Sequence, residues 1–383
     1  MAGIQKYIAA SDDEKQLLAL CANDLKPFPR SELSALLAKP QVRVDAIDRD
    51  GMSALMHAAF KGNVEACEML IARGADVNCN LQTDCYTALM FATVAGHVDV
   101  VKVLLAAGAR TSAVNNFGKT AAELGAFLGQ HTCAQVIKNF FSLSDLEVYT
   151  VPQGVDQKPI ISPSLVPLLH SLVIFVEIHP VWIIQKLRTS HNLLLSDWHA
   201  VTRVLSLVSE KLLREGQEVL SLKMHYLAYV IRRCQDNTGG PEGVLKILLT
   251  VEADGQENGM EKFMVECLMD YPHASSPLVS QMIASLRKGR EGLGVPSALS
   301  LFCRAISGGR SAEEDVAVCN TCGVSSSTAK RCTGCKKVWY CDVECQKLSW
   351  SLGNHRHLCK KWSAATSKKQ PAGDDVTSTS AKR

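Results

Sequence analysis

A dense set of cysteines near the C-terminus is the part of this sequence whose residue types and spacing could do chemistry. Seven of the 15 cysteines fall between residues 319 and 359, and with one histidine they follow the spacing C-x2-C-x9-C-x2-C-x5-C-x3-C-x9-H-x3-C. Thiolate and imidazole are ligands that zinc prefers, and eight of them complete two tetrahedral sets with no open position. The spacing therefore predicts two structural Zn2+ ions bound by Cys319, Cys322, Cys332, Cys335, Cys341, Cys345, His355 and Cys359.

The other eight cysteines are scattered singly over the first 318 residues and are typical of isolated buried thiols. The chain does not open with a basic segment followed by an apolar one, because Asp12, Asp13 and Glu14 fall within its first residues. We therefore expect an intracellular, cytoplasmic protein, in which a reduced cysteine cluster binds metal rather than forming disulfides. The most apolar stretch, 165–184, is interrupted by Pro, His and Glu, which predicts no direct insertion into a membrane.

The charge of the chain is polarised between its ends. The formal net charge is +3, but residues 319–383 carry 12 Lys/Arg and 4 Asp/Glu, which leaves a negative balance for the rest. Within 319–361 there are 8 Lys/Arg and 2 Asp/Glu, so seven thiolates and two zinc ions would leave about +3. Much of the basicity offsets thiolate charge, which argues against nucleic acid as a partner.

Residues 319–359 resemble the MYND zinc finger, whose core is recognisable in Trp339-Tyr340-Cys341, in Cys345-Gln346 and in Trp350. The resemblance implies that the ligands interleave between the two metals. One zinc would then be held by Cys319, Cys322, Cys341 and Cys345, and the other by Cys332, Cys335, His355 and Cys359. His357 offers a competing imidazole, but His355 keeps the family's three-residue spacing to Cys359.

The resemblance also implies a ligand for the finger, namely a proline-rich peptide of the Pro-x-Leu-x-Pro kind laid beside an exposed strand. Gln346 and Trp350 match the positions of the family's peptide contacts, and Val338 is their neighbour on the strand. The alternative for Trp350 is that its ring packs on the zinc core.

An internal repeat occupies the first 140 residues. Residues 53–62 align with 87–96, and 69–75 align with 103–109 at the same offset of 34, while a third copy follows near Thr120. Each unit reads as helix, tight turn, helix and loop. The pattern resembles the ankyrin repeat, with Thr/Ser-Ala-Leu-Met-x-Ala in place of Thr-Pro-Leu-His-x-Ala. It implies ankyrin repeats over 48–141 and a degenerate N-terminal capping repeat over 1–47.

Ankyrin repeats bind partners through their loop tips and inner helices. Two alternatives remain for these positions. Phe60 and Phe127 could instead pack against the next repeat. The charged loop residues could simply be solvated. Cys85 stands where glycine is usual, which predicts a distorted hairpin. The predicted partner face consists of Arg49, Asp50, Met52, Phe60, Lys61, Thr83, Asp84, Tyr86, Val94, Asn116, Phe117, Lys119, Phe127 and Leu128.

Between the repeats and the finger the sequence predicts helices and little chemistry. Prolines in 142–168 favour an extended linker or docking segment. Apolar residues at three- and four-residue spacing predict an α-helical domain of five to seven helices over 169–310, and its histidines have no metal-binding spacing. Residues 360–383 lack an apolar period and predict a disordered tail.

The order of these parts predicts a mainly α protein, with an ankyrin-repeat solenoid, an α-helical middle domain and a small C-terminal two-zinc MYND finger. Together they resemble the ankyrin-repeat and MYND-domain-containing proteins. That resemblance implies a non-enzymatic adaptor with no catalytic residues, involved in moving signalling proteins to the primary cilium, with membrane cyclases and a membrane-anchored immunophilin as partners. The alternatives are a relative of SET-type lysine methyltransferases, which also carry MYND fingers, and a transcriptional co-regulator.

Overall fold

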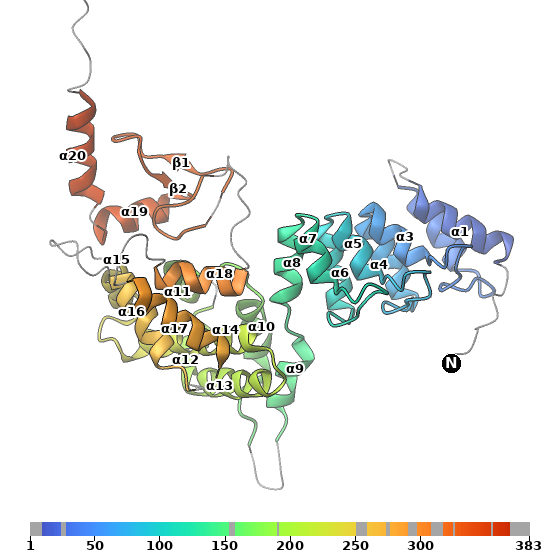
Figure 1. The fold of residues 1–383 in the computed structure, drawn as a ribbon, viewed down its shortest axis with the longest axis horizontal. Helices are drawn as coiled ribbons and strands as arrows, with labels where there is room; N and C mark the ends of the chain where they lie inside the picture. The colour runs from blue at the N-terminus through green and yellow to red at the C-terminus, as the bar shows by residue number, and fades with distance from the viewer. Residues whose placement is uncertain are drawn as a thin grey trace, which may run out of the picture. The chain divides into compact units, whose positions relative to one another are not determined.

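The computed structural model describes residues 10–23, 28–152, 158–189, 191–249, 259–272, 276–289, 297–307, 317–324, 326–353 and 355–367 (Figure 1). The described residues fall into two compact units. The first is drawn from 1–176, 199–225 and 303–311, and the second from 177–198, 226–302 and 312–383. The predicted fold class is confirmed, since the described residues are mainly helical, with a stack of paired helices, further helices and then a small finger with a two-stranded hairpin.

Eight helices in four pairs form the repeat stack at the start of the first unit (Figure 1). The inner helices α1, α3, α5 and α7 pack on one another in that order, and the outer helices α2, α4, α6 and α8 do the same. Their bounds are α1 Asp12–Ala22, α2 Arg30–Leu37, α3 Ala54–Lys61, α4 Val64–Ala72, α5 Ala88–Val94, α6 Val98–Ala106, α7 Ala121–Phe127 and α8 His131–Lys138.

The inner helices begin at the hydroxyl residues of the repeat motif. The side chains of Ser53, Thr87 and Thr120 each accept a hydrogen bond from the backbone N–H three residues on, which satisfies a donor that the first turn leaves free. At the end of α3, Gly62 has a φ of 74°, and a Cβ there would collide with the His97 ring of the next repeat. Glycine is therefore required both by backbone conformation and by the close stacking of repeats.

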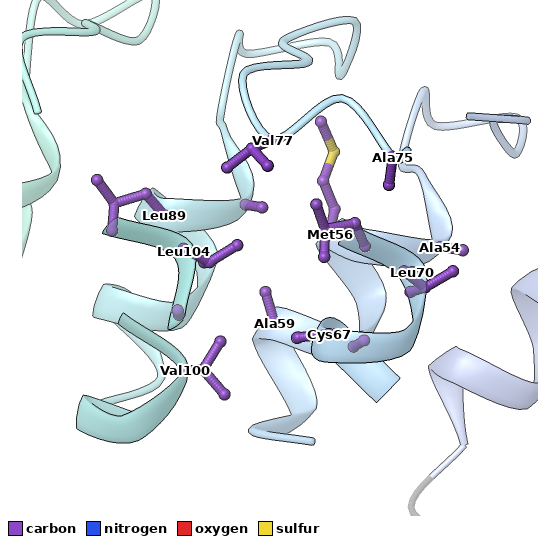
Figure 2. Close-up of a cluster of buried hydrophobic side chains, with 14 of the residues drawn as sticks. Ala54, Met56, Ala59, Cys67, Leu70, Ala75, Val77, Leu89, Val100 and Leu104 are labelled. Carbon is purple, nitrogen blue, oxygen red and sulfur yellow. The ribbon is translucent and has the colours of Figure 1, made fainter. Parts of the chain in front are cut away.

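The core of the stack is a continuous layer of small and medium side chains between the two rows of helices. Figure 2 shows Met56 and Ala59 of α3, Cys67 and Leu70 of α4, and Leu104 of α6 directed into the same interior. All five are buried, because alanine and cysteine let neighbouring helices approach closely while leucine and methionine fill the space between them.

An ion pair links the first helix of the stack to the loop that follows the second helix. Ser11 and Glu14 form a reciprocal capping box at the start of α1. Glu14 is buried and accepts hydrogen bonds from the Arg43 guanidinium, at 2.7 Å from Nε, and from the Arg43 backbone N–H at 3.0 Å. The Arg43 side chain lowers the pKa of Glu14 to about 2.

Cys85 keeps its hairpin in the form that glycine would adopt. Its φ is 59°, in the left-handed region that side chains other than glycine rarely occupy. The loop therefore keeps this conformation at a cost of about 1 kcal/mol in backbone strain.

The region after the repeats contains more helices than the sequence predicted. Segment 142–168 holds the short helix α9 (Leu143–Glu147) and two 3-10 turns, although prolines favoured an extended chain. The described part of 166–307 has nine α-helices instead of five to seven, because short helices such as α12 have no apolar period of their own. Their bounds are α10 Val166–Val173, α11 Pro180–Thr189, α12 Leu193–Ser196, α13 Trp198–Arg214, α14 Glu218–Asp236, α15 Gly240–Leu249, α16 Gly259–Met269, α17 Pro277–Gly289 and α18 Ala298–Ser307.

A buried lysine is the most unusual feature of the first unit. Lys223 of α14 is fully buried, and its Nζ donates a hydrogen bond of 2.8 Å to Oδ1 of Asn139, just beyond α8. The Asn139 amide donates in turn to the carbonyl of Ile306 in α18. Burial lowers the pKa of Lys223 to about 7. One polar network thus joins the end of the repeat stack to two helices of the middle region.

The finger consists of a short hairpin followed by two helices. Strand β1 (Lys330–Arg331) pairs antiparallel with β2 (Trp339–Tyr340), and helices α19 (Val343–Ser351) and α20 (His355–Ser367) follow. Helix α20 extends into the segment that the sequence predicted as a disordered tail, and Trp362 packs 6.0 Å from the ring of His355. The rest of that predicted tail lies outside the described residues. No helix in the described ranges has both the length and the hydropathy needed to cross a membrane.

Candidate zinc centres and recognition surfaces

The eight predicted metal ligands gather into two groups of four in the finger. Within each group all the ligand atoms lie within 4.8 Å of one another. The groups interleave along the chain as the resemblance to the MYND finger implied, and His355, rather than His357, belongs to the second. They are Cys319, Cys322, Cys341 and Cys345, and Cys332, Cys335, His355 and Cys359.

The spacing of the donors fits tetrahedral zinc. With Zn–S bonds of about 2.3 Å, neighbouring sulfurs of a tetrahedral site lie about 3.8 Å apart. In the first group Cys322 Sγ is 3.6 Å from Cys341 Sγ, and in the second Cys332 Sγ is 3.7 Å from Cys359 Sγ. His355 Nε2 lies 3.3 Å from Cys332 Sγ. The donor sets and their distances are those of two closed structural zinc sites, so the finger is a two-zinc module.

The hairpin and α19 place these ligands through backbone hydrogen bonds. Cys319 forms a bridge beside Trp339 of β2, and the N–H of Cys332 donates to the Val338 carbonyl at 2.9 Å. Asp342 caps α19 by accepting from the N–H of Cys345 at 2.7 Å. The chain is too short here to bury an apolar core, so metal binding and folding of this segment are coupled.

The local electrostatics favour the thiolate form of Cys332 in the second group. Burial by itself would raise the pKa of Cys332, but N–H groups of Cys335 and Gly334 and the imidazole of His355 outweigh it and lower the pKa to about 6. Zinc binds the thiolate form, so these donors assist metal binding as well as positioning the ligand.

Two residues beside the zinc groups could not be found from the sequence. Gln185 of α11 lies with its side-chain amide 3.7 Å from Cys345 Sγ, within the same compact unit. A Cβ on Gly334 would lie only 2.8 Å from Cys359 Sγ, so glycine is needed for the chain to pass the second group. No spacing rule indicates Gln185, since it is 160 residues from Cys345.

A pocket of about 670 Å³ opens beside the second zinc group. Gln346 and Trp350, two of the three predicted peptide contacts, line it together with the turn that follows β1. The Trp350 ring also packs edge-on against His355 at 5.6 Å, yet the residue remains 39% exposed, so it supports the zinc core and presents a surface at once. Val338 is 8% exposed and does not line the pocket, because its side chain faces the finger's interior. The lining is Cys332, Thr333, Gly334, Val343, Gln346, Lys347, Trp350, Ser351 and Cys359.

All fourteen residues of the predicted ankyrin face are at least partly exposed. Phe127 is 87% exposed, whereas Phe60 is 43% exposed and its ring meets Phe91 of the next repeat edge-on at 6.1 Å. Tyr86 lies 5.4 Å from the same Phe91 ring. Phe91 was not among the predicted residues, although its equivalence to His57 at the repeat offset of 34 could have indicated an inner-helix position. Phe60, Tyr86 and Phe91 form an aromatic cluster.

The loop tips of the face are tied to one another from repeat to repeat. Asn116 donates from its backbone N–H to the Asp84 carbonyl at 3.0 Å and from its side-chain amide to the Thr83 carbonyl at 2.9 Å. Thr83 in turn contacts the Asp50 carbonyl. These hydrogen bonds hold the loops in a fixed row, which reduces the entropy that a partner would have to remove on binding.

Comparisons with known proteins agree with this architecture. Residues 319–359 match the family model of the MYND finger, and residues 31–71 and 61–105 match that of ankyrin repeats in many copies. The protein is therefore of the class that joins ankyrin repeats to a MYND finger, both of which are protein-interaction modules.

Two curated proteins show the extent of the similarity. Dauer abnormal formation protein 25 of Caenorhabditis elegans is 31% identical to this chain over 352 residues, which cover 86% of the chain and 88% of that protein. The chain belongs to the family of ankyrin-repeat and MYND-finger proteins that includes this relative. Tudor domain-containing protein 1 of Oryzias latipes is similar over a shorter stretch, with 40% identity over 62 residues, or 15% of this chain and 5% of that protein.

Proposed function

We propose that this protein is a non-enzymatic adaptor that binds one partner on its ankyrin face and a proline-rich peptide on its finger. The observation that carries the proposal is the pocket beside Trp350, which is lined by a partly exposed aromatic ring and an amide side chain. The pocket adjoins strand β1, and within the described part of the chain one edge of β1 has no strand partner. A peptide added along a strand gains main-chain hydrogen bonds, and the pocket selects its side chains.

The ankyrin face supports the second half of the proposal. Its exposed aromatic rings, Phe60, Phe117 and Phe127, have the residue type that anchors protein interfaces. The loops beside them are held in a row by hydrogen bonds, so the surface is formed before a partner arrives. The charges around these rings are of both signs, which favours a protein surface over a polyanion.

The test of the adaptor is a pair of variants in the full chain loaded with zinc. Changing Phe60, Tyr86 and Phe127 to Ala should abolish one set of partners in crosslinked pull-downs, and Trp350→Ala should abolish a different set. Val148→Ala, which shortens another exposed apolar side chain elsewhere, is the control. If both variants retained every partner of the unmodified chain, the proposal would be wrong.

The finger's half can be tested separately with a synthetic Pro-x-Leu-x-Pro peptide and isothermal titration calorimetry. We expect binding to the full chain and a loss of at least tenfold with Trp350→Ala, since truncating a buried aromatic anchor costs about 2 kcal/mol or more. Binding that is unchanged by Trp350→Ala would place the peptide elsewhere on the chain.

The cellular setting that we propose rests on the family resemblance. We infer that the adaptor works in the cytoplasm and helps move signalling proteins, including membrane cyclases, to the primary cilium together with a membrane-anchored immunophilin. Proximity labelling with the intact chain and with Trp350→Ala would identify partners and compartment together. A nuclear location would favour the transcriptional co-regulator, and binding of S-adenosylmethionine would favour a methyltransferase-related role.

A further inference from the structure

The finger carries a surplus of positive charge that its own carboxylates do not balance. Residues 319–361 contain 8 Lys/Arg but only 2 Asp/Glu. Asp342 is engaged in capping α19, and Glu344 pairs with Lys347 at 2.9 Å. In the described part of the finger, the other cations make no ion pair, and all of them are exposed. They are Lys330, Arg331, Lys336, Lys337, Arg356, Lys360 and Lys361.

The negative charge of the two zinc centres offsets part of this positive charge. The zinc centres are interior, however, whereas the cationic residues are on the surface. A four-thiolate zinc centre carries about −2 and a three-thiolate, one-imidazole centre about −1, so the loaded finger keeps about +3. The cysteine ligands are buried or half-buried, whereas the residues that carry the cations are exposed. A ligand approaching the surface therefore meets the cations first.

Two of these cations lie on the strand that leads into the pocket. Lys330 and Arg331 make up β1, which pairs with β2 on one edge, and no other described strand pairs with its second edge. The next residues along the chain, Cys332 and Thr333, are part of the pocket wall. Arg331 is held over the Trp339 ring, with its guanidinium carbon 4.5 Å from the ring centroid. A stacked guanidinium is preorganised for a carboxylate, because less side-chain freedom is lost on binding.

We propose that the peptide bound by the finger carries acidic residues beside its proline-rich core, and that Lys330 and Arg331 recognise them. The inference rests on the proposed function of the pocket and specifies the substrate class of that same site. A chain that fills the pocket and continues along the second edge of β1 passes both cations within a few residues, since a strand advances about 3.3 Å per residue. The apolar part of the pocket, with Val343 and Trp350, favours a peptide over a nucleic acid or a membrane surface.

The test compares three fluorescent peptides that share one Pro-x-Leu-x-Pro core and differ in their flanks, which are three Asp, three Ser or three Lys on each side. Fluorescence anisotropy is measured with the full, zinc-loaded chain at 50 mM and 300 mM NaCl. Exposed charge pairs each contribute about two- to fivefold in affinity, so the acidic peptide should bind about tenfold more tightly than the Ser peptide at low salt. High salt should reduce this ratio, because the Debye length shortens.

Variants separate the two cations from the pocket. The double change Lys330→Gln with Arg331→Gln should remove the preference for acidic flanks and leave the affinity for the Ser peptide within twofold. Lys330→Glu, which keeps the Arg331 stack, should lower the affinity for the acidic peptide about fivefold or more. Lys102→Gln with Arg110→Gln removes the same charges from the ankyrin module and should change nothing. Zinc content and helicity establish that each variant is folded.

The outcomes distinguish the inference from the proposed function. If the three peptides bind equally at 50 mM NaCl, the pocket binds proline-rich peptides and the acidic preference is wrong. Failure of all three to bind overturns the proposed peptide function itself. If the acidic peptide binds Trp350→Ala as tightly as the intact chain, or if phosphatidylserine vesicles or duplex RNA compete fully, the cations form a general polyanion surface and the inference is overturned.

Discussion

Replacing the buried Lys223 with methionine should stabilise the protein at neutral pH and lose that advantage in alkali. Lys223 has an unperturbed pKa of 10.5, and burial lowers it to about 7 in the folded chain. Between these two values the unfolded chain keeps a proton that the folded chain releases, so stability rises with pH by about 1.4 kcal/mol per unit. Below pH 7 both states are protonated and the full cost of about 5 kcal/mol is present.

The size of the gain depends on what methionine leaves behind. Lys223→Met removes the cost of burying the charge but leaves Oδ1 of Asn139 without its donor, a loss of about 1–3 kcal/mol. We expect the variant to be more stable by about 2–4 kcal/mol at pH 7. At pH 10 the difference should fall to zero or change sign, because the neutral amine of the unmodified chain then donates to Asn139 at little cost.

Urea unfolding followed by far-ultraviolet circular dichroism at pH 7, 8, 9 and 10 measures this difference directly. Other titrating groups are common to both proteins and cancel. Asn139→Leu is a useful companion, since it removes the acceptor of Lys223 together with the donor to the Ile306 carbonyl, and it should destabilise the unmodified chain more than the methionine variant. A stability difference between Lys223→Met and the unmodified chain that does not vary with pH would refute the reasoning.

Further changes test the other features of the structure. Elemental analysis should give two zinc ions per chain, and a chelator should remove the helical signal of α19 and α20; one zinc or none would contradict the two donor sets. Gly334→Ala, whose new methyl group would press on Cys359 Sγ, should speed zinc release at least tenfold, while the neighbouring Thr333→Ala should not. Glu14→Gln should destabilise the first repeat by about 1–2 kcal/mol at pH 7, with the difference disappearing as pH falls from 4.5 toward 2, as measured by urea unfolding. Cys85→Gly should raise stability by about 1 kcal/mol, seen as a higher Tm, because it relieves the left-handed strain.

The repeats and the finger were predictable because their signals are local. Thr87 and Ser53 cap helices by bonding to a backbone group three residues away, and the same motif recurs at an offset of 34. The zinc ligands were equally predictable, since pairs of cysteines separated by two residues are typical of metal binding in a reduced protein. The division of the donors between two metals came from resemblance, and the distances between sulfur atoms then agreed with it.

The helical middle region was only partly predictable, because an apolar period indicates that a helix is buried but not where it turns. The four-residue helix α12 and the short helix α9 are examples. The lining of the pocket beside the finger was predicted in part for a related reason, while peptide binding itself stays a prediction. Gln346 and Trp350 line the pocket, whereas Val338, chosen as their neighbour on the strand, faces inward. In a hairpin this short, the alternation of inward and outward side chains does not determine which way a single residue points.

By itself, the sequence determined the composition of the modules. These are repeats of two helices, two sets of zinc donors, and a finger whose positive charge exceeds the negative charge of its zinc–thiolate centres. Tertiary structure alone decided which distant groups meet, such as Lys223 with Asn139 and Gln185 with Cys345. It also decided that Phe91 completes an aromatic cluster on the ankyrin face. Helix caps and metal spacings depend on neighbours in the chain, whereas burial and contacts between distant residues depend on packing, which no short stretch of sequence contains.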